Sequence, residues 1–188
     1  MKITEQTYKW NGSLTKRAST KYIILHHRAG NGDVQSIHTQ HVNQGYNGIG
    51  YHLYVRKDGS VYRGRPIDTV GAHCIGVNNV SIGVCFEGNF ENETMTPAQI
   101  KAGKELISYI KGLYPSAEVK KHKELYNTAC PGKKFPFDAI VEGAKNMDIE
   151  DAIKTVQIKA GLEDETIDFL LCYKYGEELL IKLAEAMI

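Results

Sequence analysis

The sequence predicts an α/β fold: a central mixed β-sheet flanked by helices, followed by a small all-helical C-terminal module. Short apolar runs of strand type alternate with helical segments through the first three quarters of the chain, which is the pattern of a mixed sheet covered by helices. From about residue 148 the sequence becomes helical and acidic. The 188 residues, 42% of them hydrophobic, suffice for one full-sized domain and an appendage. We therefore expect two domains, 1–146 and 147–188.

The first half of the chain predicts strands, one helix and a hairpin. KYIILHH (21–27) is a compact apolar run, typical of a buried strand, and SIHTQHVNQG (36–45) has helical spacing and ends in glycine. GYHLYVRKDGSVYRGRP (50–66) alternates on both sides of Asp58-Gly59, a dipeptide that favours a tight primed turn with positive backbone angles. VSIGVCFEG (80–88) predicts another short strand, since it is rich in β-branched residues.

A long amphipathic helix is predicted next. TPAQIKAGKELISYIKGLYP (96–115) opens with Thr96 as N-cap and has Gln99 three residues later, the arrangement of a capping box. AEVKKHKE (117–124) indicates a short strand or extended segment. FPFDAIVEGAKNM (135–147) predicts a helix that closes the domain.

The C-terminal module is predicted to contain several helices. IEDAIKTVQIKAG (149–161) ends in glycine, and the following segment up to residue 188 has leucines and isoleucines at helical spacing with a break at Gly176. About forty residues is near the lower limit for independent folding. We therefore expect the module to dock on the first domain or to self-associate.

Charge divides the chain in the same way. Residues 1–146 hold 19 Lys and Arg against 12 Asp and Glu, whereas residues 147–188 hold 4 against 10. A basic domain attracts anionic polymers, although ordinary solvated surface charge explains the excess as well. The sequence lacks an aromatic stacking platform or recognition helix, so we expect no nucleic-acid partner. No apolar stretch reaches the roughly 18 residues of a membrane span, so we expect no membrane insertion. No signal-peptide pattern opens the chain, so we expect it to be synthesised and kept in the cytoplasm until release.

Three separated places carry residue types that bind zinc. They are the pair His26 and His27, His122, and Cys130. Catalytic zinc typically takes three protein ligands from His, Cys and carboxylates and keeps a fourth position for water. Because neighbouring strand residues point to opposite faces, only one member of the pair can face an ion, and the residues leave open which. Histidines and a free cysteine packed in a core are the alternative interpretation.

Four segments together carry a resemblance to a known family. YIILHH, GIGYHLYVRKDGSVYRGRP, GAHCIGVNNVSIGVCFEGNF and HKELYNTACPG, in this order and at these separations, resemble the zinc-dependent N-acetylmuramoyl-L-alanine amidases of type 2, which share their fold with the peptidoglycan recognition proteins. The likeness covers roughly residues 20 to 140. It implies that His26, His122 and Cys130 bind Zn²⁺, and that zinc-activated water cleaves the amide between muramic acid and the first L-alanine of the stem peptide in bacterial peptidoglycan.

The same resemblance implies three catalytic residues. Glu87 stands where many members place a catalytic glutamate, which makes it the favoured general base or acid; the alternative is a carboxylate in a salt bridge. Tyr51 matches a tyrosine used near the water or the tetrahedral oxyanion; otherwise it is a packing residue. Thr128 occupies a position where relatives carry lysine or threonine, and its hydroxyl can donate one hydrogen bond without bringing charge.

Four further residues are candidates for binding the substrate. His73 and Asn78 lie where relatives line the substrate groove. Arg63 and Arg65 follow the hairpin, and a guanidinium group binds a peptide carboxylate bidentately. Two exposed hairpin arginines are the alternative.

The sequence therefore predicts a phage or prophage endolysin that reaches the wall after release from the cytoplasm. Its acidic module is interpreted as a wall-targeting module, a homo-oligomer contact or a structural extension of the first domain. The alternative function is a non-catalytic peptidoglycan-binding protein on the same fold. Relatives of that kind usually lose the cysteine ligand, whereas Cys130 is present here with the other site residues, which favours the enzyme.

Overall fold

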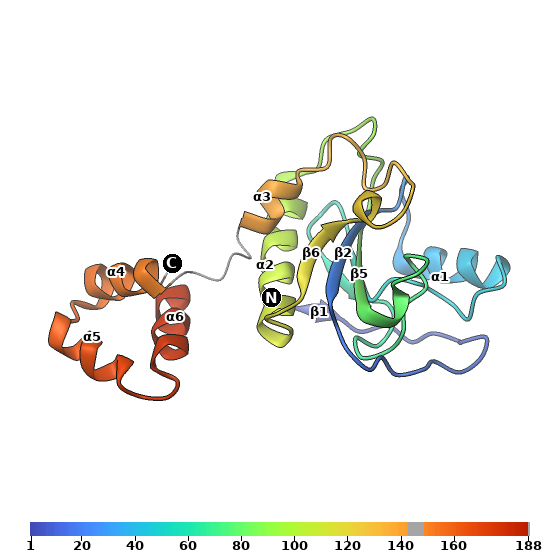
Figure 1. Cartoon of the computed structure of the whole chain (residues 1–188). Coiled ribbons are helices and arrows are strands. Elements are labelled where there is room, and N and C mark those ends of the chain that lie inside the picture. The colour runs from blue at the N-terminus through green and yellow to red at the C-terminus, as the bar shows by residue number, and fades with distance from the viewer. Residues whose placement is uncertain (143–148, 188) are drawn as a thin grey trace. The chain divides into compact units, whose positions relative to one another are not determined.

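The computed structural model describes residues 1–142 and 149–187. Contacts within the chain separate two compact units, Met1–Ala144 and Lys145–Ile188. The first contains a six-stranded sheet and the second contains helices (Figure 1).

The sheet is mixed, as predicted. Its strands are β1 (Ile3–Thr4), β2 (Tyr22–His27), β3 (Leu53–Val55), β4 (Val61–Arg63), β5 (Ser81–Phe86) and β6 (Glu118–Lys121). They lie in the order β1-β4-β3-β5-β2-β6, in which β3 and β4 are antiparallel and all other neighbours are parallel. The sequence did not predict β1, because two residues are too few to show a strand periodicity.

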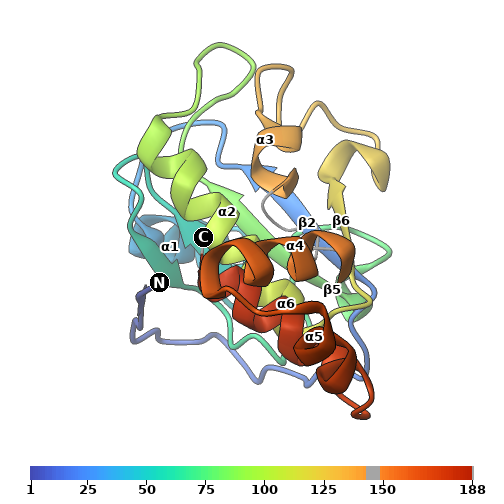
Figure 2. The same cartoon turned by 90° about the vertical axis from the view of Figure 1, so that its left-hand side faces the viewer.

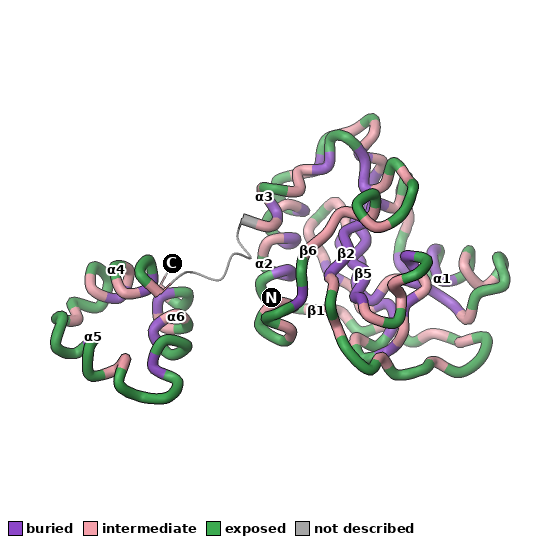
Figure 3. Tube along the Cα trace, viewed as in Figure 1, coloured by how far each residue is buried: buried purple, intermediate pink, exposed green. Residues whose placement is uncertain are grey.

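Helices cover both faces of this sheet. They are α1 (Val34–Asn43), α2 (Pro97–Leu113) and α3 (Phe137–Glu142). On one face Leu25 of β2 packs in a cluster with Leu106 of α2 and Ile140 of α3. On the other face Ile37 of α1 packs in a second cluster with Cys85 of β5. Figure 2 views this unit from the α2 side, and Figure 3 shows that buried residues concentrate in β2 and β5, as expected for parallel strands covered on both sides.

The first helix begins earlier than predicted. It starts at Val34 because Oδ1 of Asp33 accepts a hydrogen bond from the backbone N–H of Ser36 (2.7 Å) and caps the first turn. The helix ends at Asn43, just before the predicted glycine stop.

The hairpin between β3 and β4 forms as predicted, but its turn is of another type. Arg56 N–H donates to the Ser60 carbonyl, and Gly59 N–H donates to the Arg56 carbonyl, both at 2.9 Å. Gly59 has a φ of 85°, whereas Asp58 is not among the described non-glycine residues with positive φ. A primed turn needs positive φ at its first central residue. The prediction of a primed turn was therefore wrong, and the loop has the three-residue pattern that ends in a left-handed glycine.

Thr96 caps α2 as predicted, since its hydroxyl accepts from Gln99 N–H (3.1 Å). The side chain of Gln99 does not reach back as a capping box requires. It is fully buried and donates to the carbonyls of Val55 (3.0 Å) and Glu87 (2.9 Å). Gln99 therefore fastens the start of α2 to the ends of β3 and β5.

The second unit contains α4 (Ile149–Ala160), α5 (Asp164–Leu171) and α6 (Gly176–Ala186), so the expected breaks at Gly161 and Gly176 lie at helix boundaries. Its own core includes Val156, Ile167 and Leu180. The last part of the helix predicted over 135–147 lies outside the described residues. Among the helices that the structure describes, none is long and apolar enough to cross a bilayer.

Candidate metal centre

The register of two parallel strands brings the first two candidate ligands together. β2 and β6 are neighbours, and Leu25 of β2 lies opposite Lys121 of β6. The next residue of each segment is therefore placed side by side at the carboxyl end of the sheet. These residues are His26 and His122, whose ring centroids lie 4.3 Å apart.

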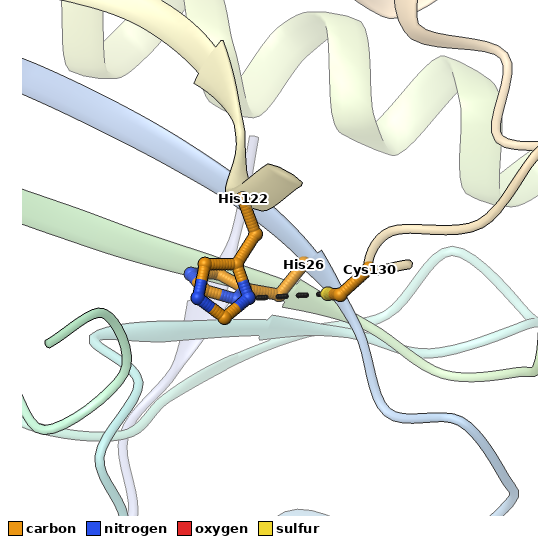
Figure 4. Close-up of side chains that lie close together, drawn as sticks. All are labelled: His26, His122 and Cys130. Carbon is orange, nitrogen blue, oxygen red and sulfur yellow. Dashed lines mark hydrogen bonds between the residues drawn. The ribbon is translucent and has the colours of Figure 1, made fainter. Parts of the chain in front are cut away.

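Cys130 reaches the same place from the loop that follows the 3₁₀ turn η2 (His122–Glu124). The loop is tied back by a hydrogen bond from Lys123 N–H to the Cys130 carbonyl (2.9 Å). Sγ of Cys130 lies 3.8 Å from Nδ1 of His26, and it accepts the backbone N–H of His27 at 3.4 Å. The three potential ligand atoms of His26, His122 and Cys130 all lie within 4.8 Å of one another (Figure 4).

The ring nitrogens of His122 are free to bind a metal ion. Both of its ring nitrogens are buried, and neither has a hydrogen-bond partner within the described part of the chain. A buried polar atom left unpaired costs about 1–3 kcal/mol. Other histidines of this unit use a ring nitrogen to accept a backbone N–H: His27 from Phe90, His38 from Ile49, His41 from Gly50 and His52 from Gly83. Two imidazoles and one thiol are a donor set that suits zinc.

The structure also separates His26 from His27. Nδ1 of His27 accepts the N–H of Phe90 (3.2 Å), a member of the cluster beneath α2. His26 lies opposite Cys85 in the sheet and therefore points to the other face, where His122 and Cys130 lie. The alternative with His27 as ligand is thus not supported by this geometry.

Burial sets the protonation states of these groups. It lowers the pKa of His26 well below its ordinary value, which keeps the ring neutral as a metal ligand must be. It also raises the pKa of Cys130 to about 11. The thiolate that binds metals is therefore favoured only when a cation compensates its charge.

Tyr51 and Thr128 lie beside this cluster. The ring of Tyr51 is 5.2 Å from that of His26, and burial, followed by the neighbouring thiols of Cys85 and Cys130, raises the pKa of Tyr51 well above its ordinary value. Its hydroxyl therefore remains a proton donor. Oγ1 of Thr128 accepts the N–H of Cys130 (3.2 Å), so this hydroxyl shapes the turn that presents the thiol.

Glu87 has other partners than those that catalysis would require. Oε1 accepts the N–H of Gly32 (3.1 Å), and Oε2 accepts the N–H of Lys57 (3.1 Å) and Nε of Arg56 (3.3 Å). With only 5% of Glu87 exposed, the carboxylate holds the loop after β2 against the β3–β4 hairpin. These contacts are those of the salt-bridge alternative, and the general-base role of Glu87 stays a prediction.

The two arginines that were expected to meet the substrate lie elsewhere. Arg63 is in register with Leu53, whose side chain packs under α2, so it points to the face opposite His26 and pairs with Glu5 at 3.3 Å. Arg65 is buried, and its guanidinium donates to two backbone carbonyls, one of them that of Ile49 (2.6 Å). The sequence did not reveal this register or these buried acceptors, and binding of a peptide carboxylate by the two arginines stays a prediction without a contact that supports it.

His73 and Asn78 also differ from groove-lining residues. Oδ1 of Asn78 accepts the N–H groups of His73 (2.8 Å) and Cys74 (2.9 Å), so this side chain braces its own loop. His73 is only 9% exposed, and its Nδ1 lies 3.0 Å from Nε2 of His26. Sequence reasoning missed this contact and the glycine beside it, Gly83. A glycine inside a strand indicates that another group approaches the backbone closely, which was the available signal.

A mixed sheet whose strand ends gather two imidazoles and a thiol, with a tyrosine beside them, is an arrangement typical of metal-dependent hydrolases. The profile of the N-acetylmuramoyl-L-alanine amidase family, Amidase_2, matches residues 16–133. The chain belongs to this family.

Individual relatives agree with this assignment. The endolysin of Enterobacteria phage K11 is 34% identical over 126 residues, which is 62% of this chain and 83% of that protein. Peptidoglycan-recognition protein SC2 of Drosophila melanogaster is 35% identical over 142 residues, 66% of this chain and 77% of that protein. Among solved structures, the N-acetylmuramoyl-L-alanine amidase LysC from Clostridium intestinale superposes with a TM-score of 0.73 at 40% identity, covering 76% of this chain and 96% of that one.

Proposed function

We propose that this protein is a zinc-dependent amidase that hydrolyses the bond between N-acetylmuramic acid and L-alanine in bacterial peptidoglycan. The observation that carries the zinc requirement is His122, whose two buried ring nitrogens are unpaired within the described residues and which lies in a cluster with His26 and Cys130. When bound there, zinc supplies a Lewis acid for the scissile carbonyl and a water of lowered pKa.

The residues around the metal have separable tasks in this proposal. His26, His122 and Cys130 hold the ion. Tyr51 keeps its hydroxyl proton and donates a hydrogen bond to the carbonyl oxygen as negative charge develops on it. Thr128 holds the loop that carries the thiol, through its bond to Cys130 N–H. The proposal assigns no proton transfer to Glu87, because its carboxylate is occupied by Gly32, Arg56 and Lys57.

Metal removal tests this function directly. We expect the purified protein to contain about one zinc ion per chain and to release L-alanine amino termini from purified cell walls. Dialysis against a chelator should stop the release, and stoichiometric zinc should restore it. A native protein without metal that binds wall fragments and frees no amino termini would instead support the non-catalytic peptidoglycan-binding alternative.

We further propose that the enzyme acts as an endolysin of phage or prophage origin, which reaches the wall after release from the cell that makes it. The phage endolysins among its relatives support this proposal. Fractionation of the producing cells tests it, because the enzyme should remain inside until the membrane is breached. Its appearance outside intact cells would contradict the proposal.

The second unit is proposed to mediate association, either with the wall or with a second copy. It exposes large apolar side chains, among them Phe169 (61%), Tyr173 (59%) and Tyr175 (65%). We expect Phe169→Ser with Tyr175→Ser to reduce cosedimentation with walls, or to convert a dimer to a monomer in analytical ultracentrifugation. The control is Lys159→Gln, which changes an exposed side chain in the last turn of α4. If the double variant cosediments with walls as the native protein does and its mass in ultracentrifugation is unchanged, only the structural-extension interpretation is left.

A further inference from the structure

His73 makes its closest side-chain contact with a proposed metal ligand. Nδ1 of His73 lies 3.0 Å from Nε2 of His26, and the two rings meet edge to face at 5.0 Å. The other ring nitrogen of His26, Nδ1, faces Sγ of Cys130 at 3.8 Å. His26 therefore has one nitrogen directed to the proposed metal position and the other directed to His73.

Ser81, His73 and His26 form a series of side-chain contacts, and the direction of its hydrogen bonds follows from the Ser81 end. The hydroxyl of Ser81 lies 2.7 Å from the carbonyl of Val77, which can only accept, so Ser81 donates there. Oγ of Ser81 can then accept from Nε2 of His73, 3.4 Å away. In this arrangement the single N–H of the neutral His73 ring lies on Nε2, so Nδ1 of His73 accepts and Nε2 of His26 donates to it. The lone pair of His26 is thereby left on Nδ1, the nitrogen that faces Cys130.

The fold is built to hold His73 in this place. A Cβ at Gly83 of β5 would lie 2.5 Å from the His73 ring, and a Cβ at Gly71 would lie 2.4 Å from it. The backbone N–H of Gly83 is fixed by Nδ1 of His52 (3.0 Å), whose Nε2 lies 2.9 Å from the Thr69 carbonyl. Two positions without a side chain thus make room for the imidazole, and His52 fixes one of them.

We propose that His73 is a positioning residue, which accepts the Nε2 proton of His26 and so fixes the ring orientation and tautomer that present Nδ1 to zinc. A partner of this kind typically contributes 10- to 100-fold to metal affinity or activity. This inference rests on the proposed zinc centre and replaces the expectation that His73 lines the substrate groove. Its ring contributes to the metal site through His26, while its Nε2 is directed to Ser81 inside the fold.

A matched pair of substitutions tests the proposal. Asparagine and leucine are close in shape, but in His73→Asn the side-chain oxygen can accept from His26 Nε2, whereas His73→Leu removes the acceptor. We expect His73→Leu to weaken zinc binding by about 10- to 100-fold in competition with a chromophoric chelator. His73→Asn should keep zinc affinity within about tenfold of the native protein, toward the low end of the loss expected for an outer-shell partner. For wall digestion at saturating zinc, we expect kcat to fall in His73→Leu while KM stays unchanged.

The tautomer of His26 gives a readout that is independent of catalysis. In ¹⁵N-labelled, metal-free protein we expect His26 to carry its proton on Nε2 in the native chain and in His73→Asn. In His73→Leu, and in Ser81→Ala, which removes the hydroxyl that faces Nε2 of His73, we expect a mixture of His26 tautomers. Thermal melting of each variant shows that it is folded.

The outcomes separate this inference from the proposed amidase function. A raised KM with native zinc affinity in both His73 variants would overturn the positioning role and restore a role in the groove. A His26 ring that carries its proton on Nδ1 in the native protein would also overturn it. Native tautomers and zinc affinity without wall cleavage would instead contradict the amidase function and leave the positioning role of His73 intact.

Discussion

Cys130→Ser is expected to abolish zinc binding and wall cleavage together. The thiol supplies the only anionic ligand of the proposed set, and a serine hydroxyl stays neutral where a cation must be compensated. The loss in zinc affinity should exceed the roughly 10- to 100-fold that an outer-shell partner contributes, so we expect a drop on the order of 10³-fold, about 4 kcal/mol. The measurements are zinc content after gel filtration and the release of L-alanine amino termini from purified walls.

The matched control is Cys172→Ser at the C-cap of α5. Cys172 is a free, exposed cysteine of the second unit, so its substitution removes a thiol without touching the cluster. It should leave zinc content and cleavage unchanged. Full activity with no bound metal in Cys130→Ser would contradict the metal centre itself, since His26 and His122 would then have no ion to hold.

The elements and the position of the site were predictable because their signals are local. KYIILHH has an apolar middle and ends in two histidines, so both the buried strand β2 and the position of its histidines at the strand end could be predicted. Thr96 and the helical spacing after it likewise predicted α2. The family likeness connected His26 with His122 and Cys130, which no spacing in the chain does.

The sequence did not predict which face of the sheet a side chain lies on, how the strands are registered, or which groups a buried side chain contacts. Ile23, Ile24 and Leu25 are all apolar, so the pattern does not show which face α2 covers, and His26 could not be separated from His27. The face on which Arg63 lies could not be predicted either, because it is set by the pairing of Arg63 with Leu53 across the hairpin.

The contacts of Glu87 could not be predicted for a related reason. The three hydrogen-bond partners of Glu87 come from two distant loops, and the local sequence VCFEGNF does not predict them. The role of a buried polar side chain is decided by the donors that the fold brings to it.

Tyr51→Phe is expected to lower turnover by on the order of 10²–10³-fold while zinc content stays native. The substitution keeps the ring against His26 and removes only the hydroxyl, so metal binding should persist. Loss of one preorganised donor to a developing oxyanion has an effect of this size. The hydroxyl is suited to this task because burial among the Cys85 and Cys130 thiols raises the pKa of Tyr51 well above its ordinary value. The measurement is kcat for wall digestion beside zinc content and thermal melting.

Two control variants make the Tyr51 result specific. Tyr8→Phe removes a hydroxyl that donates to the Arg63 carbonyl (2.6 Å) away from the cluster, and it should cost about 1 kcal/mol of stability with native kcat. Glu87→Gln should lower the free energy of unfolding by about 1–3 kcal/mol through its lost charged hydrogen bonds, again with native kcat in the folded fraction. A collapse of kcat in Glu87→Gln with zinc and stability retained would return the general-base role to that carboxylate. Native kcat in Tyr51→Phe would remove the tyrosine hydroxyl from the mechanism, because the substitution changes nothing else that touches the substrate.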